Sequence, residues 1–188
     1  SIRPMRSHEI AVMRIGRYLL GTKDRGMIYR PDSKRGLEIF VDADFAGGWD
    51  PEDAENADNV YSHTGYVICY AGCPMFWQSK LQTEIALSTA EAEYIALSQA
   101  LRETLPMSNL MREMDVIFPL YLPRPKFVLK VREDNQSCIA MTNNPKFTPR
   151  TKHIAIKYHH FRKHVKSQSN PDGFIEIEYC STEEQLAD

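Results

Sequence analysis

Three β-rich segments follow one another in this chain before any long helical pattern begins, and this order limits the sheet that can form. The segments are residues 37–42, 63–70 and 73–78, and the last two flank Ala71 and Gly72, which predict a hairpin turn. Two further strand patterns, at 127–134 and 173–179, come after helical segments. Consecutive strands followed by helix-linked strands predict an α/β fold, with a five-stranded mixed sheet flanked by helices.

Acidic residues occupy four notable positions in this pattern. Asp42 ends the first strand, Glu93 lies in a helix that begins after Ser88, and Asp134 ends the fourth strand. The fourth is Asp188, which a capping pattern at residues 181–184 is expected to carry into a closing helix. Asp44 shares the strand face of Asp42 and remains an alternative to it, although Asp42 lies deeper in the apolar run.

The helix after Ser88 carries two glutamates, and helix geometry separates their roles. Ser88 and Glu91 fit a capping box, so Glu91 is expected to close the first turn. Glu93 instead heads an apolar stripe through Leu97 and Leu101, the face that a helix lays on its sheet. A glutamate on that face needs a partner.

Two of the acids also have purely structural interpretations. Asp134 could be the N-cap of a short helix that begins at Asn135, and Asp188 could be an ordinary solvated acid. The combination is more informative, because carboxylates about 4 Å apart repel by roughly 4 kcal/mol at an effective dielectric near 20. Such a cluster must take up protons or bind cations. Oxygen ligands suit Mg²⁺ or Mn²⁺, and two such ions about 3.5–4 Å apart serve in-line phosphodiester displacement.

Eight short motifs carry a resemblance to a known family. They are Val41-Asp42-Ala43-Asp44-Phe45-Ala46-Gly47, His63-Thr64-Gly65-Tyr66-Val67, Trp77-Gln78-Ser79-Lys80, Leu87-Ser88-Thr89-Ala90-Glu91-Ala92-Glu93-Tyr94, Asp134-Asn135, Asn144-Pro145, Arg150-Thr151-Lys152-His153-Ile154 and Glu184-Gln185-Leu186-Ala187-Asp188. In this order they resemble the ribonuclease H domain of reverse transcriptases from copia-type LTR retrotransposons (Pseudoviridae). The resemblance covers the chain from about residue 37 to its end.

The resemblance implies a ribonuclease H-like fold and a metal-dependent endonuclease. The expected substrate is the RNA strand of an RNA–DNA hybrid, cut during reverse transcription to leave 3′-hydroxyl and 5′-phosphate ends. Asp42 and Asp134, with Asp188 nearby, would hold one Mg²⁺ ion, and Asp42 with Glu93 would hold the second. Mn²⁺ is expected to substitute for Mg²⁺, and no small-molecule cofactor is expected.

Substrate contacts are expected at two places. By resemblance, Thr89 and Gln136 meet the RNA strand near the cut. The chain has a net charge of −2, but residues 135–171 contain no acidic residue and many basic ones. That stretch predicts a phosphate-facing surface, with a solvated helix face as the alternative. Within it, we expect backbone binding from Arg150, Lys152 and His153.

The sequence predicts two parts in the chain. Residues 1–36 resemble the connection that leads out of the polymerase thumb, and residues 37–188 form the ribonuclease H domain. The expected partner besides the hybrid is therefore the polymerase domain of the same polyprotein. No run is apolar enough to span a membrane, so we expect a soluble, cytoplasmic protein within virus-like particles. The four cysteines lack zinc-type spacing and are expected to be reduced thiols in or near the core.

Several positions depart from the family pattern. The loop 179–184 contains no histidine, so proton transfer or product release would fall to Glu183, His153 or His159, or to no such group. Pro106 is expected to kink or end the long helix at about Leu105. An acidic residue common after the Lys-His-Ile motif is replaced by alanine at 155, and the acidic loop 50–58 is longer than usual.

Two alternatives to this function belong to other classes. A non-catalytic nucleic-acid-binding or scaffolding module could use the same fold, but it predicts the loss of one or more of the four carboxylates. An integrase or resolvase of the same superfamily is the other alternative. The motif at 150–154 and the thumb-like leader argue against it.

Overall fold

The computed structural model describes residues 5–49, 51, 57–118, 128–143 and 159–188. The chain divides into two compact units, Ser1–Arg30 and Pro31–Asp188. The first unit contains α1 (Arg6–Thr22), a helix that buries none of its residues. The expected boundary at residue 36 therefore differs from the structural division by six residues. The role of the first unit as a connection stays a prediction.

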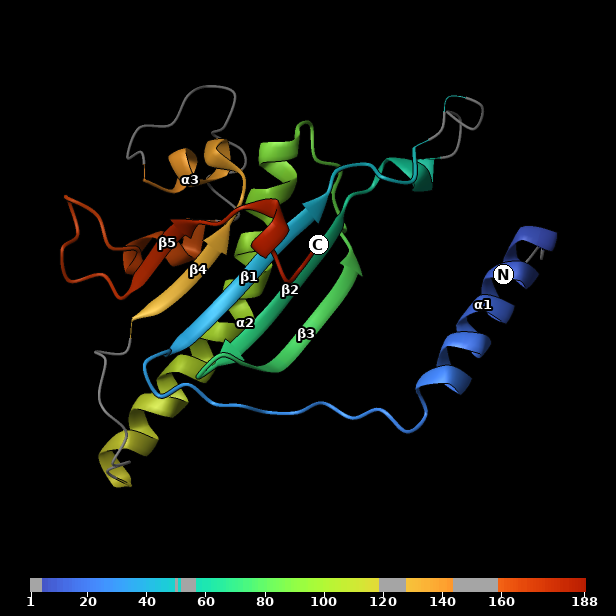
Figure 1. The fold of residues 1–188 in the computed structure, drawn as a ribbon. Helices are drawn as coiled ribbons and strands as arrows, with labels where there is room; N and C mark the ends of the chain where they lie inside the picture. The colour runs from blue at the N-terminus through green and yellow to red at the C-terminus, as the bar shows by residue number, and fades with distance from the viewer. Residues whose placement is uncertain (1–4, 50, 52–56, 119–127, 144–158) are drawn as a thin grey trace. The chain divides into compact units, whose positions relative to one another are not determined.

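The second unit is built on one five-stranded sheet (Figure 1). Its strands are β1 (Leu37–Asp44), β2 (His63–Tyr70), β3 (Cys73–Leu81), β4 (Leu129–Glu133) and β5 (Ile175–Tyr179). They lie in the order β3-β2-β1-β4-β5. The first three strands pair antiparallel, whereas β4 runs parallel to both β1 and β5. The predicted mixed sheet is confirmed.

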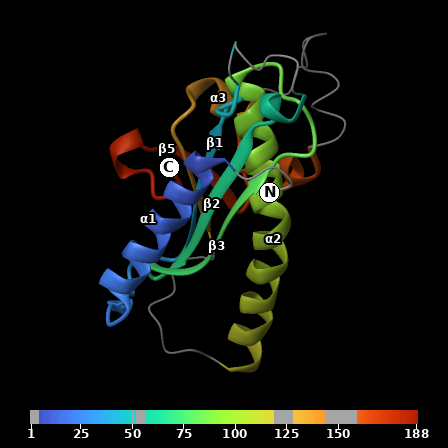
Figure 2. The same ribbon diagram turned by 90° about the vertical axis from the view of Figure 1, so that its right-hand side faces the viewer.

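The helices of this unit are α2 (Thr89–Ile117) and α3 (Gln136–Asn143), with short 3₁₀ turns η2 (Ala57–Val60), η3 (His159–His164) and η4 (Thr182–Glu184). Figure 2 shows α2 lying along one face of the sheet, where it contacts β1 and β2. Among the described residues, no helix combines the length and apolar character needed to cross a membrane.

The core forms between α2 and one face of the sheet. Leu37, Ile39 and Val41 alternate along β1 toward this face, where they join buried residues of β2 and α2. The intervening residues Glu38 and Phe40 therefore lie on the opposite face, and Asp42 follows beyond Phe40, the last residue of β1 that pairs with β4. All of the cysteines are buried free thiols, as the sequence predicted: Cys69, Cys73, Cys138 and Cys180.

The predicted hairpin between β2 and β3 is also confirmed. Its two turn residues, Ala71 and Gly72, have φ angles of 52° and 75°. Positive φ at both central positions is the pattern of a type I′ turn, whose twist matches that of the flanking strands. Glycine adopts this conformation without steric cost, and alanine at the first position does not.

Pro106 was expected to kink or end the long helix at about Leu105, and of these two outcomes the end of the helix is wrong. Helix α2 continues through Pro106 to Ile117. A proline inside a helix removes one backbone hydrogen bond, but packing continues beyond it here. Ser108 is buried, and Met107 and Met111 pack against the core, so tertiary contacts hold the helix after the proline.

Candidate metal centre

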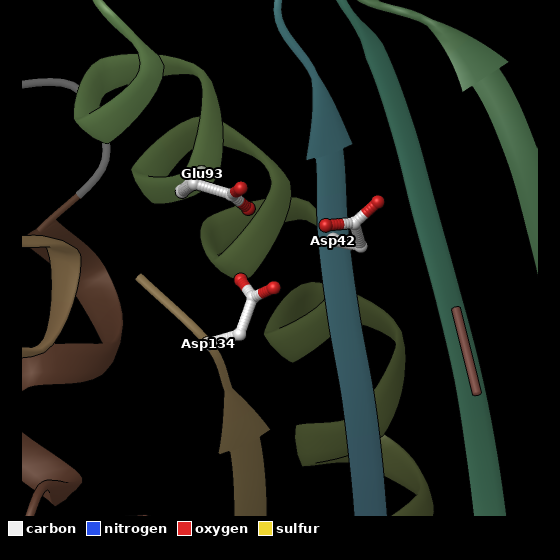
Figure 3. A group of neighbouring side chains, drawn as sticks. All are labelled: Asp42, Glu93 and Asp134. Carbon is white, nitrogen blue, oxygen red and sulfur yellow. The ribbon is translucent and has the colours of Figure 1, made fainter. Parts of the chain in front are cut away.

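Three carboxylates from distant parts of the sequence meet at one end of the sheet. Asp42 comes from β1, Glu93 from the first turns of α2, and Asp134 from the residue directly after β4. Each offers a carboxylate oxygen, and these oxygens all lie within 4.8 Å of one another. Figure 3 shows the three side chains directed toward a common point. We call these three residues the carboxylate triad.

The start of α2 determines which glutamate reaches the triad. Ser88 is the N-cap, and its side-chain oxygen accepts a hydrogen bond from the backbone N–H of Glu91 at 3.2 Å. The Glu91 carboxylate in turn accepts the backbone N–H of Leu87 at 2.9 Å. Glu91 therefore stabilises the first turn, as predicted, and Glu93 is left facing the sheet.

The structure also separates Asp134 from the capping of α3. The side-chain oxygen of Asn135 accepts the backbone N–H groups of Ser137 and Cys138, both at 3.0 Å. Asn135 is thus the cap of α3, and Asp134 is not. The Asp134 carboxylate instead accepts a hydrogen bond from the Thr182 hydroxyl at 2.9 Å.

Burial and the repulsion between neighbouring acids raise the pKa values of Asp42 and Glu93. Burial first, and then the charges of Asp134 and Asp188, raise the pKa of Asp42. Burial and the charges of Glu133 and Asp42 raise the pKa of Glu93 to about 9. Both shifts mean that ionised carboxylates are unfavourable here without a compensating cation.

The residues of the triad fit a divalent cation. All of the donors are carboxylate oxygens, the type that Mg²⁺ and Mn²⁺ prefer. Among the described residues, none of the ion pairs involves a triad carboxylate. One buried oxygen of Glu93, Oε2, also has no hydrogen-bond partner within the described part of the chain. A cation would compensate both the orphaned oxygen and the repulsion.

Glu133 is a buried acid at this centre that sequence reasoning missed. Its side chain is 0 % exposed, and its pKa rises to about 8, chiefly through burial and also through the charges of Asp134 and Asp42. The signal was present in the sequence, because Leu129, Val131 and Glu133 alternate along β4 toward the buried face.

Asp188 lies near the triad but outside it. The predicted closing helix is wrong: only Thr182–Glu184 forms a 3₁₀ turn, and the Ser181 side chain makes no capping hydrogen bond. Asp188 is exposed, and its carboxylate is not among the oxygens grouped within 4.8 Å. Its charge nevertheless raises the pKa of Asp42, so the two side chains are within electrostatic reach. The alternative residue Asp44 is not part of the triad.

Of the residues predicted to bind substrate, two belong to the described part of the chain and three do not. Thr89 and Gln136 are the exposed first residues of α2 and α3, a few positions from Glu93 and Asp134. Their contact with substrate stays a prediction. The other predicted contacts, Arg150, Lys152 and His153, lie outside the described residues. Most of the acidic loop 50–58 also lies outside them.

Comparisons with known proteins place this geometry in context. The chain is 32% identical over 185 residues to a retrovirus-related Pol polyprotein from transposon RE1 of Arabidopsis thaliana. It is 35% identical over 185 residues to the corresponding polyprotein from transposon TNT 1-94 of Nicotiana tabacum. Each match covers 98% of this chain but only 11% and 12% of the relatives, so the chain spans about a tenth of their length. No protein-family model matches the chain.

A solved structure shows the same fold. It is a ribonuclease H1 isolated from compost by a metagenomic approach, and it superposes with a TM-score of 0.52 at 17% identity. The superposition covers 80% of this chain and 88% of the ribonuclease. The sheet and helices described above are therefore those of the ribonuclease H fold.

Proposed function

Because this chain belongs, as one segment, to the retrovirus-related Pol polyproteins of copia-type transposons and has the ribonuclease H fold, we propose that it is their RNA-cutting nuclease. The proposed reaction is metal-dependent hydrolysis of the RNA strand of an RNA–DNA hybrid. Cleavage leaves 3′-hydroxyl and 5′-phosphate ends.

The observation that carries this proposal is the convergence of the carboxylate triad. Asp42, Glu93 and Asp134 come from three separate elements, yet their oxygens lie within 4.8 Å of one another. Three acids gathered in this way destabilise a fold unless they bind cations or protons. A non-catalytic module has no need to keep such a cluster intact, so the triad favours the enzyme over a recruitment module.

In the proposed site, Asp42 and Asp134, with Asp188 beside them, would hold one Mg²⁺ ion, and Asp42 and Glu93 would hold the other. When bound, the ions would activate the attacking water and stabilise charge on the departing 3′ oxygen. The residues around them fix the ligands: Thr182 donates to Asp134, and Asn135 holds the start of α3 beside it. Such supporting hydrogen bonds hold a ligand in the orientation that the metal requires.

The proposed substrate contacts come from two groups of residues, the first at the starts of two helices and the second in the basic stretch of the sequence. Thr89 and Gln136 begin the two helices that flank the triad, and we assign them to the RNA strand. Arg150, Lys152 and His153 bind the phosphate backbone. The polymerase domain of the same polyprotein is the proposed partner, and it works with this segment in the cytoplasm, inside virus-like particles.

The test is cleavage of an end-labelled RNA–DNA hybrid in Mg²⁺ and in Mn²⁺, beside duplex RNA and duplex DNA. We expect cleavage of the RNA strand of the hybrid alone. Asp42→Asn and Glu93→Gln should each lower kcat by about 10³-fold, because a metal contributes several kcal/mol to the transition state and about 1.4 kcal/mol is tenfold in rate.

Glu91→Gln is the matched control for Glu93→Gln, because Glu91 lies two residues away in the same turn, outside the triad, and its carboxylate accepts the backbone N–H of Leu87 at the helix start. It should retain most of the activity. Hybrid binding without cleavage by the parent chain, with either metal, would instead support a recruitment module.

A further inference from the structure

We propose that Gly65 and Gln185 are positioning residues that dock the last segment of the chain, residues 185–188, across β1 and β2, so that Asp188 stands beside Asp42. This inference rests on the proposed function, because it assigns how the fourth carboxylate of that site is held. No regular helix holds residues 185–188, because the preceding 3₁₀ turn, η4, ends at Glu184.

Gly65 provides the space that the segment needs. It lies on β2 directly opposite Asp42 in the antiparallel pairing. A Cβ atom at Gly65 would stand 2.7 Å from the backbone oxygen of Ala187, a distance that real Cβ atoms essentially never show. The backbone of Ala187 therefore crosses β2 in contact with Gly65, one residue before Asp188.

The backbone conformation of Gly65 gives no other reason for a glycine. Gly65 does not have a positive φ. Among the described glycines, only Gly72 does. Any residue could adopt this strand geometry, and a glycine inside a strand weakens it. Glycine in such a place marks the close approach of another backbone, which here is that of Ala187.

Gln185 holds the same segment to β1. Its side chain is buried, and its amide nitrogen donates to the backbone oxygen of Val41 at 2.8 Å. Val41 is the residue directly before Asp42. The pairing between β1 and β4 ends at Phe40, so the Gln185 amide continues the hydrogen bonding of β1 one residue beyond the last β4 partner.

The side-chain oxygen of Gln185 makes a hydrogen bond within the segment itself. Its oxygen accepts the backbone N–H of Ala187 at 3.3 Å. One side chain thus joins β1 to the residue that contacts Gly65. A glutamate at 185 would keep the shape but lose the donor, and its charge would face the carbonyl of Val41.

Residues just before the segment attach this part of the chain to β4 as well. The backbone N–H of Cys180 donates to the backbone oxygen of Glu133 at 3.0 Å, and Thr182 donates to Asp134. The segment is therefore fixed at Asp134 on one side and at Val41 and Gly65 on the other. Asp188 follows directly, and its charge acts on Asp42.

The test is a double-mutant cycle in the 188-residue chain, with Gly65→Ala, Gln185→Glu and Asp188→Asn alone and in pairs. Each single variant should lower kcat by about 10- to 100-fold, the range for residues that orient metal ligands, with KM for the hybrid unchanged. Gly65→Ala should cause no further loss when Asp188 is already Asn, because both changes remove the same carboxylate.

Matched controls separate docking from general damage. Gly36→Ala introduces a Cβ whose nearest atom is 3.9 Å away, and Asn109→Asp makes the same change from amide to carboxylate at an exposed position of α2, outside the predicted phosphate-facing stretch. Both should behave as the parent chain does. Amide hydrogen exchange provides a readout independent of activity: Gly65→Ala and Gln185→Glu should speed exchange at Ala187 while the sheet amides stay protected.

Each outcome has a distinct meaning. If Gly65→Ala and Gln185→Glu speed amide exchange at Ala187 but leave kcat unchanged, the positioning role is overturned and the proposed nuclease function stands. Unchanged exchange at Ala187 in Gly65→Ala would overturn the docking itself. If the parent chain cleaves no hybrid, the proposed function fails. The double-mutant cycle is then repeated with Mn²⁺ affinity, measured by electron paramagnetic resonance titration, in place of kcat. Additive losses of affinity in that cycle would reject the inference.

Discussion

The carboxyl group of Glu133 lies close enough to Glu93 that its charge, after burial itself, is the main cause of the raised pKa of Glu93, which reaches about 9. Both side chains are buried, and each has an Oε2 atom without a hydrogen-bond partner among the described residues. A second buried acid therefore stands behind the carboxylate triad and adds to the negative charge that a cation must balance.

The stability of the metal-free chain should fall as pH rises. Glu93 and Glu133 have folded-state pKa values of about 9 and about 8, against an ordinary value of 4.5. Between these limits the folded state binds more protons than the unfolded state, so the free energy of unfolding decreases with increasing pH. Thermal denaturation followed by circular dichroism in EDTA should show a midpoint that declines from pH 5 to pH 9. A midpoint that rises over this interval would contradict the assignment.

Metal binding should reverse that trend. Because carboxylates bind metal in their ionised form, metal and protons compete for the triad. The increase in midpoint caused by Mg²⁺ should therefore grow with pH, and it should largely disappear in Glu93→Gln. The same melts with saturating Mg²⁺ measure this, and an increment independent of pH would show that the ion binds elsewhere.

Substitution of Glu133 should stabilise the metal-free chain at high pH. Glu133→Gln removes a buried charge and lowers the repulsion acting on Glu93, so its midpoint at pH 9 should exceed that of the parent chain. At pH 5, where the acid is neutral in the folded state, the two chains should differ little. Glu113→Gln, at an exposed position of α2, should follow the parent chain at every pH.

The cap of α3 should contribute measurably to stability. Asn135→Ala removes the acceptor for the N–H groups of Ser137 and Cys138, and the loss of an N-cap costs about 1 kcal/mol. Urea denaturation at fixed pH gives the free energy of unfolding directly. Asn109→Ala, at an exposed position within α2, is the control and should cost nothing. An equal cost at both positions would remove Asn135 from the role of cap.

Phosphate contacts should appear in the salt dependence of hybrid binding. Arg150→Ala and Lys152→Ala should each weaken binding and reduce the slope of log K against log salt by about 1, since each loses one phosphate contact. Fluorescence anisotropy with a labelled hybrid in Ca²⁺, at several salt concentrations, measures the slope. An unchanged slope in both variants would place the phosphate surface elsewhere.

The parts of the molecule that local sequence signals determine were predictable. Alternating apolar residues located the strands, and the capping box at Ser88 separated Glu91 from Glu93. The position of Asp134 after β4 followed from the same alternation, although only the structure shows that Asn135 takes the cap. These signals depend on neighbours a few residues apart, which a sequence displays directly.

The parts that depend on distant contacts were not predictable. The capping pattern at Ser181 indicated a closing helix, but residues 185–188 instead contact β1 through Gln185 and β2 through Ala187. Pro106 indicated a helix end, but packing of Met107 and Met111 carries α2 onward. In both cases tertiary packing outweighs local preference.

The hydrogen bond from Gln185 to Val41 joins residues 144 positions apart in the sequence. Contacts of such long range form late in folding, because the intervening chain must be ordered before they repay the entropy of closure. During synthesis, β1 leaves the ribosome long before its partner does. A ribosome-bound chain that has passed Asp134 but has not yet reached residue 185 would therefore carry all three triad acids but not the completed site, and RNA held nearby would be spared until translation of this segment is finished.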